Sequence, residues 1–359
     1  MRLKHFLLSA AALLTMALTS LYVWRAELAV ALASRVAAKH LAETGLETLP
    51  DGLHVGLCGA GSPFPDERRA GPCTLVIAGE QMLVFDAGNG ASRNLGKMGF
   101  QVGRLQAVFL THFHSDHMDG LGELLLQRWV QGGHEVPLPV YGPPGVEQVL
   151  EGLMQAYRQD RGYRVAHHGE TTVPPSGFGG TAQPFMLSGS TATQVYRQGG
   201  LEVWAFGVQH SPVQPAVGYR IHYKGRTVVI SGDTVRSEVL TREAAGTDLL
   251  LHDALSPSLI RVLQQSASQA KRDKLAKIFS DIPDYHATPE DAAQTAQQAH
   301  VGMLILHHIA PTLPPLPGME KAFLGQAASI FKGPIRVGID GDFVSLPAGS
   351  KAIQTSQRF

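Results

Sequence analysis

The sequence predicts an α/β fold, in which apolar strands and amphipathic helices alternate along the chain. Residues 105–110 (LQAVFL) are an apolar run of strand length, whereas residues 121–130 and 146–158 place their apolar side chains at helical spacing. The 39 glycines and 22 prolines suit the many loops of such a fold. Hydrophobic residues make up 44% of the 359 residues and charged residues 17%, so the chain can bury a sizeable core.

The first 25 residues are predicted to be a signal peptide or a membrane anchor. Arg2, Lys4 and His5 precede an apolar stretch over 6–24, and the next charge is Arg25. The stretch is long for a cleaved signal peptide and near the lower limit for a spanning helix, so both alternatives stay open. Either one exports the rest of the chain. We therefore expect a periplasmic or membrane-anchored protein whose catalytic domain lies outside the cytoplasm, with the membrane as a partner if the segment is retained.

Residues 26–50 are predicted to be a helical stem, because Leu28, Leu32 and Val36 recur at helical spacing. One globular domain is expected over 51–346, followed by a frayed tail over 347–359. Between residues 160 and 200 the abundant Gly, Ser, Thr and Pro predict a long loop with short strands near the functional site. The predicted strands cover residues 53–57, 74–78, 82–85, 105–110, 136–141, 201–208, 216–223, 227–230, 249–251, 302–306, 335–339 and 343–346.

The chain has only two cysteines, Cys58 and Cys73, and neither belongs to a CxxC pair, which excludes a cysteine zinc site. In an exported domain they could form a disulfide, and two buried thiols are an equally good reading. Lys+Arg and Asp+Glu both number 30, so the net charge is zero. This balance lacks the basic excess of strongly cationic nucleic-acid binders, although a local basic patch is compatible with it.

Residues 111–120 (THFHSDHMDG) are the most informative part of the sequence. His112, His114, Asp116 and His117 lie within six positions. Neutral imidazoles and ionised carboxylates are the groups that bind Zn²⁺. The segment follows the predicted strand 105–110, so these side chains would lie at the end of a strand, where α/β sheets place their chemistry. The pattern predicts a metal site.

Three further candidates end later strands, and they are His210, Asp233 and His308. Each of them alone would more often be an ordinary polar residue at the end of a strand. Three such residues in addition to the first segment favour a dinuclear metal centre. By strand alternation His307 would point away from His308, so only one of the two is expected to bind metal.

The sequence resembles the metallo-β-lactamase fold superfamily, in the branch that contains ribonuclease Z and alkyl or aryl sulfatases. The resemblance covers about residues 53–346 and rests on residues 59–63 (GAGSP), 85–88 (FDAG), 111–117 (THFHSDH), 210, 218–220 (GYR), 231–234 (SGDT), 286–288 (HAT) and 306–309 (LHHI). It implies a four-layer αβ/βα sandwich, in which two mixed β-sheets face each other and are flanked by helices. The metals would lie at one edge of this sandwich.

The resemblance also implies roles for individual residues. One zinc would be held by His112, His114 and His210, and the other by Asp116, His117 and His308. Asp233 would bridge two Zn²⁺ ions, for which Mn²⁺ or Fe are alternatives, and Asp86 would orient a ligand.

In the same family pattern the nucleophile is a metal-bridging hydroxide, steered by Asp116 and Asp233. His286 would be the proton donor for the leaving group. The ribonuclease pattern pairs this histidine with a glutamate, and Asp253 stands in its place with a shorter reach.

The sequence predicts a binuclear zinc-dependent hydrolase of a small-molecule phosphodiester or sulfate ester, with a homodimer as the default assembly. The alternative is a ribonuclease Z-like endoribonuclease for tRNA 3′ processing. A β-lactamase-type hydrolase and a non-catalytic metal-binding module rank lower. Two observations disfavour tRNA: the exporting leader, and the short connection between Arg220 and Ser231, where many family ribonucleases carry an RNA-gripping arm.

Overall fold

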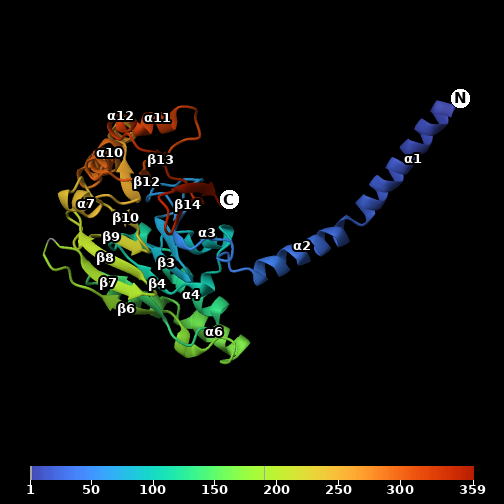
Figure 1. Cartoon of the computed structure of the whole chain (residues 1–359), viewed down its shortest axis with the longest axis horizontal. Coiled ribbons are helices and arrows are strands. Elements are labelled where there is room, and N and C mark those ends of the chain that lie inside the picture. The colour runs from blue at the N-terminus through green and yellow to red at the C-terminus, as the bar shows by residue number, and fades with distance from the viewer. Residues whose placement is uncertain (1, 190) are drawn as a thin grey trace. The chain divides into compact units, whose positions relative to one another are not determined.

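The computed structural model describes residues 2–189 and 191–359. It comprises an N-terminal unit that ends at Thr48 and a second unit from Leu49 to Phe359. The N-terminal unit consists of helices α1 (Arg2–Val23) and α2 (Arg25–Ala42), which meet at Trp24 (Figure 1). Residues 4–23 of α1 are long and apolar enough to cross a membrane.

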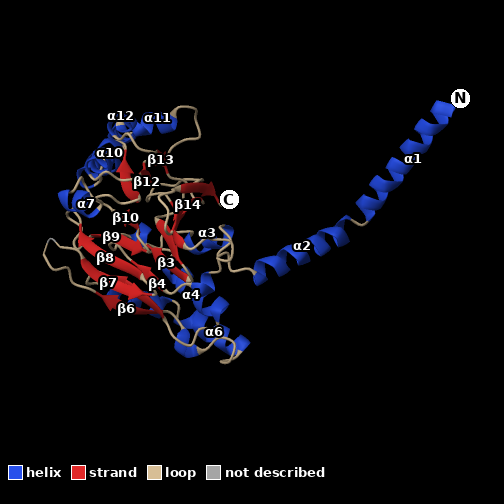
Figure 2. Ribbon diagram, viewed as in Figure 1, coloured by secondary structure: helices blue, strands red, loops and turns tan. Residues whose placement is uncertain are grey.

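The second unit contains two mixed β-sheets with helices on their outer faces (Figure 2). This arrangement confirms the predicted fold class. The strand order of one sheet is β15-β14-β1-β2-β3-β4-β5-β6, and that of the other is β13-β12-β11-β10-β9-β8-β7. The first sheet comprises β1 (Gly52–Gly59), β2 (Cys73–Ala78), β3 (Gln81–Phe85), β4 (Ala107–Phe109), β5 (Leu138–Gly142), β6 (Gly180–Pro184), β14 (Asp342–Pro347) and β15 (Gln354–Gln357). The second comprises β7 (Thr193–Gln198), β8 (Leu201–Gly207), β9 (Val217–Tyr223), β10 (Arg226–Ile230), β11 (Leu249–Leu255), β12 (Met303–Ala310) and β13 (Ile335–Val337).

The α-helices of this unit fill the connections between strands. They are α3 (Ala91–Lys97), α4 (Leu121–Gly132), α5 (Val146–Ala156), α6 (Arg158–His168), α7 (Glu238–Glu243), α8 (Pro257–Gln269), α9 (Asp273–Asp281), α10 (Pro289–Gln298), α11 (Met319–Leu324) and α12 (Ala327–Ile330). Short 3-10 turns are η1 (Val102–Arg104), η2 (Ser115–His117), η3 (Pro175–Gly177) and η4 (Ile282–Tyr285). The turn η2 carries Asp116 and His117, and η4 ends directly before His286.

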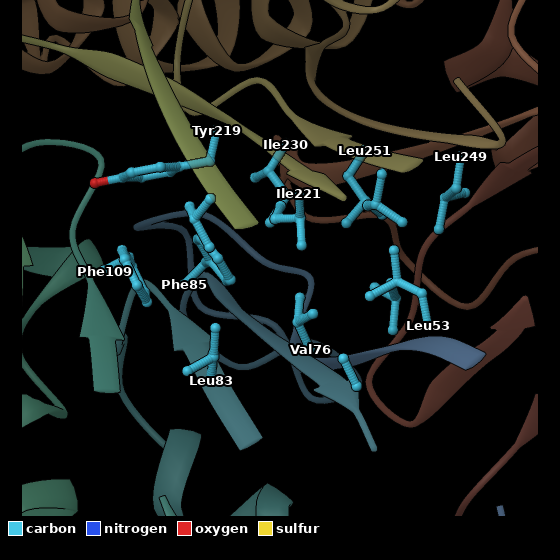
Figure 3. Packing of buried hydrophobic residues seen from close by; sticks show 14 of the residues in the cluster. Leu53, Val76, Leu83, Phe85, Phe109, Tyr219, Ile221, Ile230, Leu249 and Leu251 are labelled. Atoms are coloured by element: carbon cyan, nitrogen blue, oxygen red, sulfur yellow. The ribbon is translucent and has the colours of Figure 1, made fainter. Parts of the chain in front are cut away.

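The main core fills the space between the two sheets (Figure 3). Phe85 stacks on Phe109 at a ring-centroid distance of 4.8 Å and meets the edge of Tyr219 at 5.2 Å. The buried Tyr219 hydroxyl donates a hydrogen bond of 2.6 Å to the carbonyl oxygen of Leu110. Because Leu110 lies two residues before His112, this contact between the sheets fixes the start of the candidate metal segment.

Two sequence-based predictions about local structure are wrong. The tail is not frayed, because β15 pairs with β14 in antiparallel register. All four residues of β15 are exposed and polar, so the strand gives no apolar alternation to detect. Residues 160–168, expected to begin a loop near the site, belong to helix α6 (Arg158–His168), which buries none of its residues and ends at His167 and His168.

The connection between β9 and β10 is as short as predicted. Only Lys224 and Gly225 separate the strands, and both have positive φ values, 46° and 77°. Two successive residues of this kind are typical of the tight turn that suits the twist of an antiparallel hairpin. An extended arm therefore does not leave the domain at this position.

Cys58 at the end of β1 forms a disulfide with Cys73 at the start of β2. The bridge closes the loop over 59–72, which runs beside the end of β12: the amide of Ile309 donates to the carbonyl of Ala60, and the Ser62 hydroxyl donates to the carbonyl of Ile309 at 2.8 Å. The disulfide therefore joins the base of a loop that contacts the strand bearing His308.

Removing this bridge should destabilise the fold. The double substitution Cys58→Ala with Cys73→Ala is expected to lower the free energy of unfolding by about 3 kcal/mol, since closing a loop of roughly 15 residues restricts the unfolded chain by that amount. Denaturant unfolding of both proteins without reductant measures the difference. Equal stability, together with two free thiols in the unsubstituted protein by mass spectrometry, would show that the bridge does not form.

Candidate metal centre

The candidate metal ligands lie where strands of both sheets end. The strands β8, β10 and β12 run in the same direction, because β8 and β10 are both antiparallel to β9 and β10, β11 and β12 are parallel. His210 and Asp233 follow the ends of β8 and β10, and His308 lies near the end of β12. The segment with His112 follows β4 of the other sheet. One edge of the sandwich therefore collects all of these side chains.

Asp233 lies at the centre of this group. Its Oδ2 atom is 3.2–3.8 Å from the Nε2 atoms of four histidines, which are His308, His117, His112 and His210. One carboxylate oxygen among so many imidazoles is the geometry expected of a bridging ligand.

The ligand atoms fall into two groups, each within 4.8 Å. One group contains His112, His114, His210 and Asp233, and the other contains Asp116, His117 and His308. The structure thus brings together all seven residues that the sequence suggested as ligands. Their individual roles as ligands stay predictions. His307 belongs to neither group.

The side chains present fit two metal ions. Among the described residues, the buried atoms Nε2 of His112, Nε2 of His117 and Oδ1 of Asp233 have no hydrogen-bond partner. Unpaired buried polar atoms are costly unless another ligand, such as a metal ion, occupies them. A donor set of imidazole nitrogens and carboxylate oxygens is also the one that zinc prefers.

The electrostatics of the site suit metal binding. Burial lowers the pKa of His112 well below its usual value, so that this ring stays neutral. Burial alone would raise the pKa of Asp233, but the nearby His308 and His117 outweigh it and hold that pKa well below its usual range. For His117, burial opposes charge, yet Asp233 and Asp86 raise its pKa well above the ordinary value. Metal binding would therefore displace a proton from His117.

Asp86 holds His117 in place from behind. Its Oδ2 atom accepts a hydrogen bond from His117 Nδ1 at 2.8 Å and another from the Thr111 hydroxyl at 2.8 Å, while its Oδ1 accepts from the Thr111 amide at 2.8 Å. With Nδ1 occupied, Nε2 of His117 faces the metal centre. The geometry agrees with the orienting role expected for Asp86.

Replacing Asp86 by Asn should weaken metal binding about 10- to 100-fold, since a histidine ligand then loses its charged acceptor. Competition with a chelator of known affinity measures the effect. Asp160→Asn on α6 is the matched control, because that carboxylate pairs with Arg164 and belongs to neither ligand group. Equal metal affinity of the Asp86 variant and the control would contradict the orienting role.

His286 lies between η4 and α10 and is held by Asp253. Its Nδ1 atom is 3.1 Å from Asp253 Oδ2, and the other oxygen of Asp253 is 3.1 Å from His252 Nδ1. Burial would raise the pKa of Asp253, but hydrogen bonds from His252 and His286 lower it to about 2. The shorter aspartate therefore reaches the histidine. A capping box between Thr288 and Asp291 fixes the start of α10 just behind.

His286 also lies close to the metal ligands. Its Nδ1 atom is 3.9 Å from Asp233 Oδ2, and its ring stacks against that of His308 at 5.2 Å. With Asp233 and His308 it forms a third group that could hold an ion. The geometry is compatible with a proton donor at the centre and also with a ligand.

A cavity of about 230 Å³ opens onto the centre. It is lined by Pro63, Phe64, His114, Ser115, Asp116, Asp233, Ile282, Tyr285, His286, His308 and Ala310. The sequence did not single out Phe64 or Tyr285. The position of Tyr285 directly before His286 was the available signal for one of them, whereas Phe64 reaches the site through a loop whose course is set by tertiary contacts.

The chain is similar to known proteins of one family along most of its length. The family model described as Metallo-beta-lactamase superfamily matches residues 66–280. The chain is 38% identical over 290 residues to a ribonuclease Z of Mycobacterium bovis, which covers 80% of this chain and 96% of the relative. It is 39% identical to a ribonuclease Z of Mycolicibacterium gilvum over 80% of this chain and 94% of the relative.

Solved structures share the fold at low sequence identity. The metallo-beta-lactamase fold protein YhfI from Bacillus subtilis superimposes with a TM-score of 0.58 at 20% identity, over 82% of this chain and 100% of that chain. The short form of human tRNase Z gives a TM-score of 0.57 at 20% identity, over 82% and 99%. The family model matches more than half of the chain, and the ribonuclease Z relatives match it along nearly their whole length. The cluster of histidines and aspartates lies at the edge of the sandwich. The chain therefore belongs to the metallo-β-lactamase superfamily, in its ribonuclease Z-like branch of metal-dependent hydrolases.

Proposed function

We propose that this hydrolase is an endoribonuclease that cleaves a phosphodiester bond at the 3′ end of tRNA precursors. The observation that carries the proposal is the match to proteins named ribonuclease Z over 96% of their length, in a chain that keeps the complete candidate ligand set. The prediction of a small-molecule ester as the substrate is wrong. The relatives are ribonucleases Z, and a structural neighbour is a tRNase Z.

The residues at the centre can divide the work of hydrolysis. Two metal ions held there would supply a nucleophilic water at neutral pH and offset the charge of the phosphate. We propose that they are zinc, which the nitrogen-rich donor set favours. His286 faces the cavity with Nδ1 anchored on Asp253, which leaves Nε2 free to give a proton to the departing oxygen. The ionised Asp253 stabilises the protonated ring.

The RNA must be held by segments other than the β9–β10 connection. That connection is a two-residue turn of Lys224 and Gly225, so it offers no arm. The lack of an arm was one of two reasons to disfavour tRNA. An arm would bind the RNA away from the hydrolytic centre, so its absence does not change that centre.

We also propose that α1 directs export and that the catalytic unit lies outside the cytoplasm. The proposal is supported by the length and apolar character of residues 4–23 and by the Cys58–Cys73 disulfide, since disulfides persist in oxidising compartments. This location is the other of the two reasons against tRNA, so the location and the substrate are tested by separate experiments. Protease added to spheroplasts, from which the outer membrane has been opened, should degrade the catalytic unit, and full protection of that unit until the spheroplasts are lysed would overturn the proposal.

The substrate is tested with the purified full chain in detergent, loaded with zinc, and a tRNA precursor that carries a 3′ trailer. We expect one endonucleolytic cut at the trailer junction, mapped by RNA sequencing, and no cut in mature tRNA. Asp233→Asn serves as the inactive control. A folded protein with full metal content that leaves the precursor intact would contradict the proposed function.

A further inference from the structure

We infer that the cavity beside the metal centre contains a nucleobase-binding subsite formed by Phe64 and Tyr285. The inference rests on the proposed function and defines which part of the RNA enters this cavity. The lining of the cavity includes candidate metal ligands, among them Asp116, Asp233 and His308. It also includes Phe64 and Tyr285 together with apolar side chains, so the same cavity offers polar and aromatic groups.

The two aromatic rings are held firmly by their surroundings. Phe64 is half-buried and stacks on Phe279 at a ring-centroid distance of 6.1 Å. It also packs against a cluster that includes Ile260 and Ala310. The half-buried Tyr285 packs at 5.1 Å from the His210 ring and at 4.8 Å from the His286 ring. Both rings therefore present an aromatic surface to the cavity with little freedom left to lose.

Main-chain contacts on both sides fix these positions. The carbonyl of Pro65, next to Phe64, accepts a hydrogen bond of 2.7 Å from the Thr312 hydroxyl, and the loop is closed at its base by the disulfide. The carbonyl of Tyr285 accepts a hydrogen bond of 2.9 Å from His210 Nδ1. The second contact links Tyr285 directly to a candidate metal ligand. Such preorganisation favours a rigid, flat ligand.

A nucleotide matches both kinds of lining group at once. Its phosphate would face the metal centre, and its base would lie against the aromatic rings, because every base offers a face for stacking. A volume of about 230 Å³ suits one nucleotide at most, so the subsite would take the single base next to the scissile phosphate. Stacking on such rings changes affinity about ten- to a hundredfold per base.

The test compares adenosine 5′-monophosphate with ribose 5-phosphate, which lacks the base, as ligands of the zinc-loaded full chain in calorimetric titrations. We expect the nucleotide to bind roughly ten- to a hundredfold more tightly. Phe64→Ala and Tyr285→Ala should each reduce this preference, and Tyr285→Phe should keep it. Tyr163→Ala, on the exposed face of α6, is the matched control and should bind like the unsubstituted protein.

Equal binding of the two ligands by the unsubstituted protein, or a preference that survives both alanine substitutions, would overturn the subsite. Metal content is measured in each variant. If Tyr285→Ala loses metal through its contact with His210, Phe64→Ala alone decides. Cleavage of the tRNA precursor without a preference for the nucleotide would leave the proposed function standing and remove the subsite. A clear preference for the nucleotide without cleavage of the RNA would support the subsite and contradict the proposed function.

Discussion

Asp233→Asn is expected to remove at least one of the two metal equivalents and to lower RNA cleavage by at least about 100-fold, beyond the effect of losing a residue that only orients a ligand. The reason lies in the position of its Oδ2 atom, within 3.2–3.8 Å of four imidazole nitrogens. The amide keeps the shape of the side chain but removes its negative charge. Two metal ions held by this carboxylate would both lose their common counter-charge.

Elemental analysis of the purified protein measures this loss without reference to any substrate. Asp160→Asn keeps the same chemical change on the surface of α6 and should retain two equivalents and full activity. A variant at position 233 that holds two equivalents and cleaves at the normal rate would refute the bridging role. Loss of activity with both metals retained would instead show that Asp233 orients the nucleophile and is not needed to bind the metals.

The ligand positions could be predicted because they depend on local sequence. Apolar runs such as 105–110 and 304–306 end in polar residues, and parallel strands bring such ends to one edge of a sheet. The pairing of Asp253 with His286 could not be derived in this way. It joins residues 33 positions apart across a strand end and a 3-10 turn, and its distance depends on tertiary packing.

The errors have equally physical causes. Helix α6 and strand β15 bury almost nothing, and the periodicity of burial is what reveals elements in a sequence. The substrate prediction relied on the leader and on the short connection between Arg220 and Ser231, and the net charge of zero pointed weakly the same way. Net charge averages over 359 residues, whereas recognition of RNA depends on local groups around the site.

The second large effect is expected at His286. Replacing it by Ala should lower the rate of RNA cleavage about 10²- to 10⁴-fold, the usual contribution of a positioned proton donor, while both metal equivalents remain. His167→Ala at the exposed end of α6 is the matched control. Loss of metal would assign His286 to the ligand group that it forms with Asp233 and His308.

Asp253→Asn separates the two roles further. Asp253 is buried and has a pKa of about 2, so at neutral pH it is a carboxylate that holds His286 Nδ1 at 3.1 Å. The amide can still accept this hydrogen bond but no longer stabilises a protonated ring. If His286 is the proton donor, Asp253→Asn should lower the rate roughly 10- to 100-fold with metal content unchanged. If His286 is a ligand, the same substitution should weaken metal binding, because a neutral partner makes the ring a poorer donor. Comparing the loss of metal with the loss of rate therefore shows whether His286 acts as the proton donor or as a metal ligand.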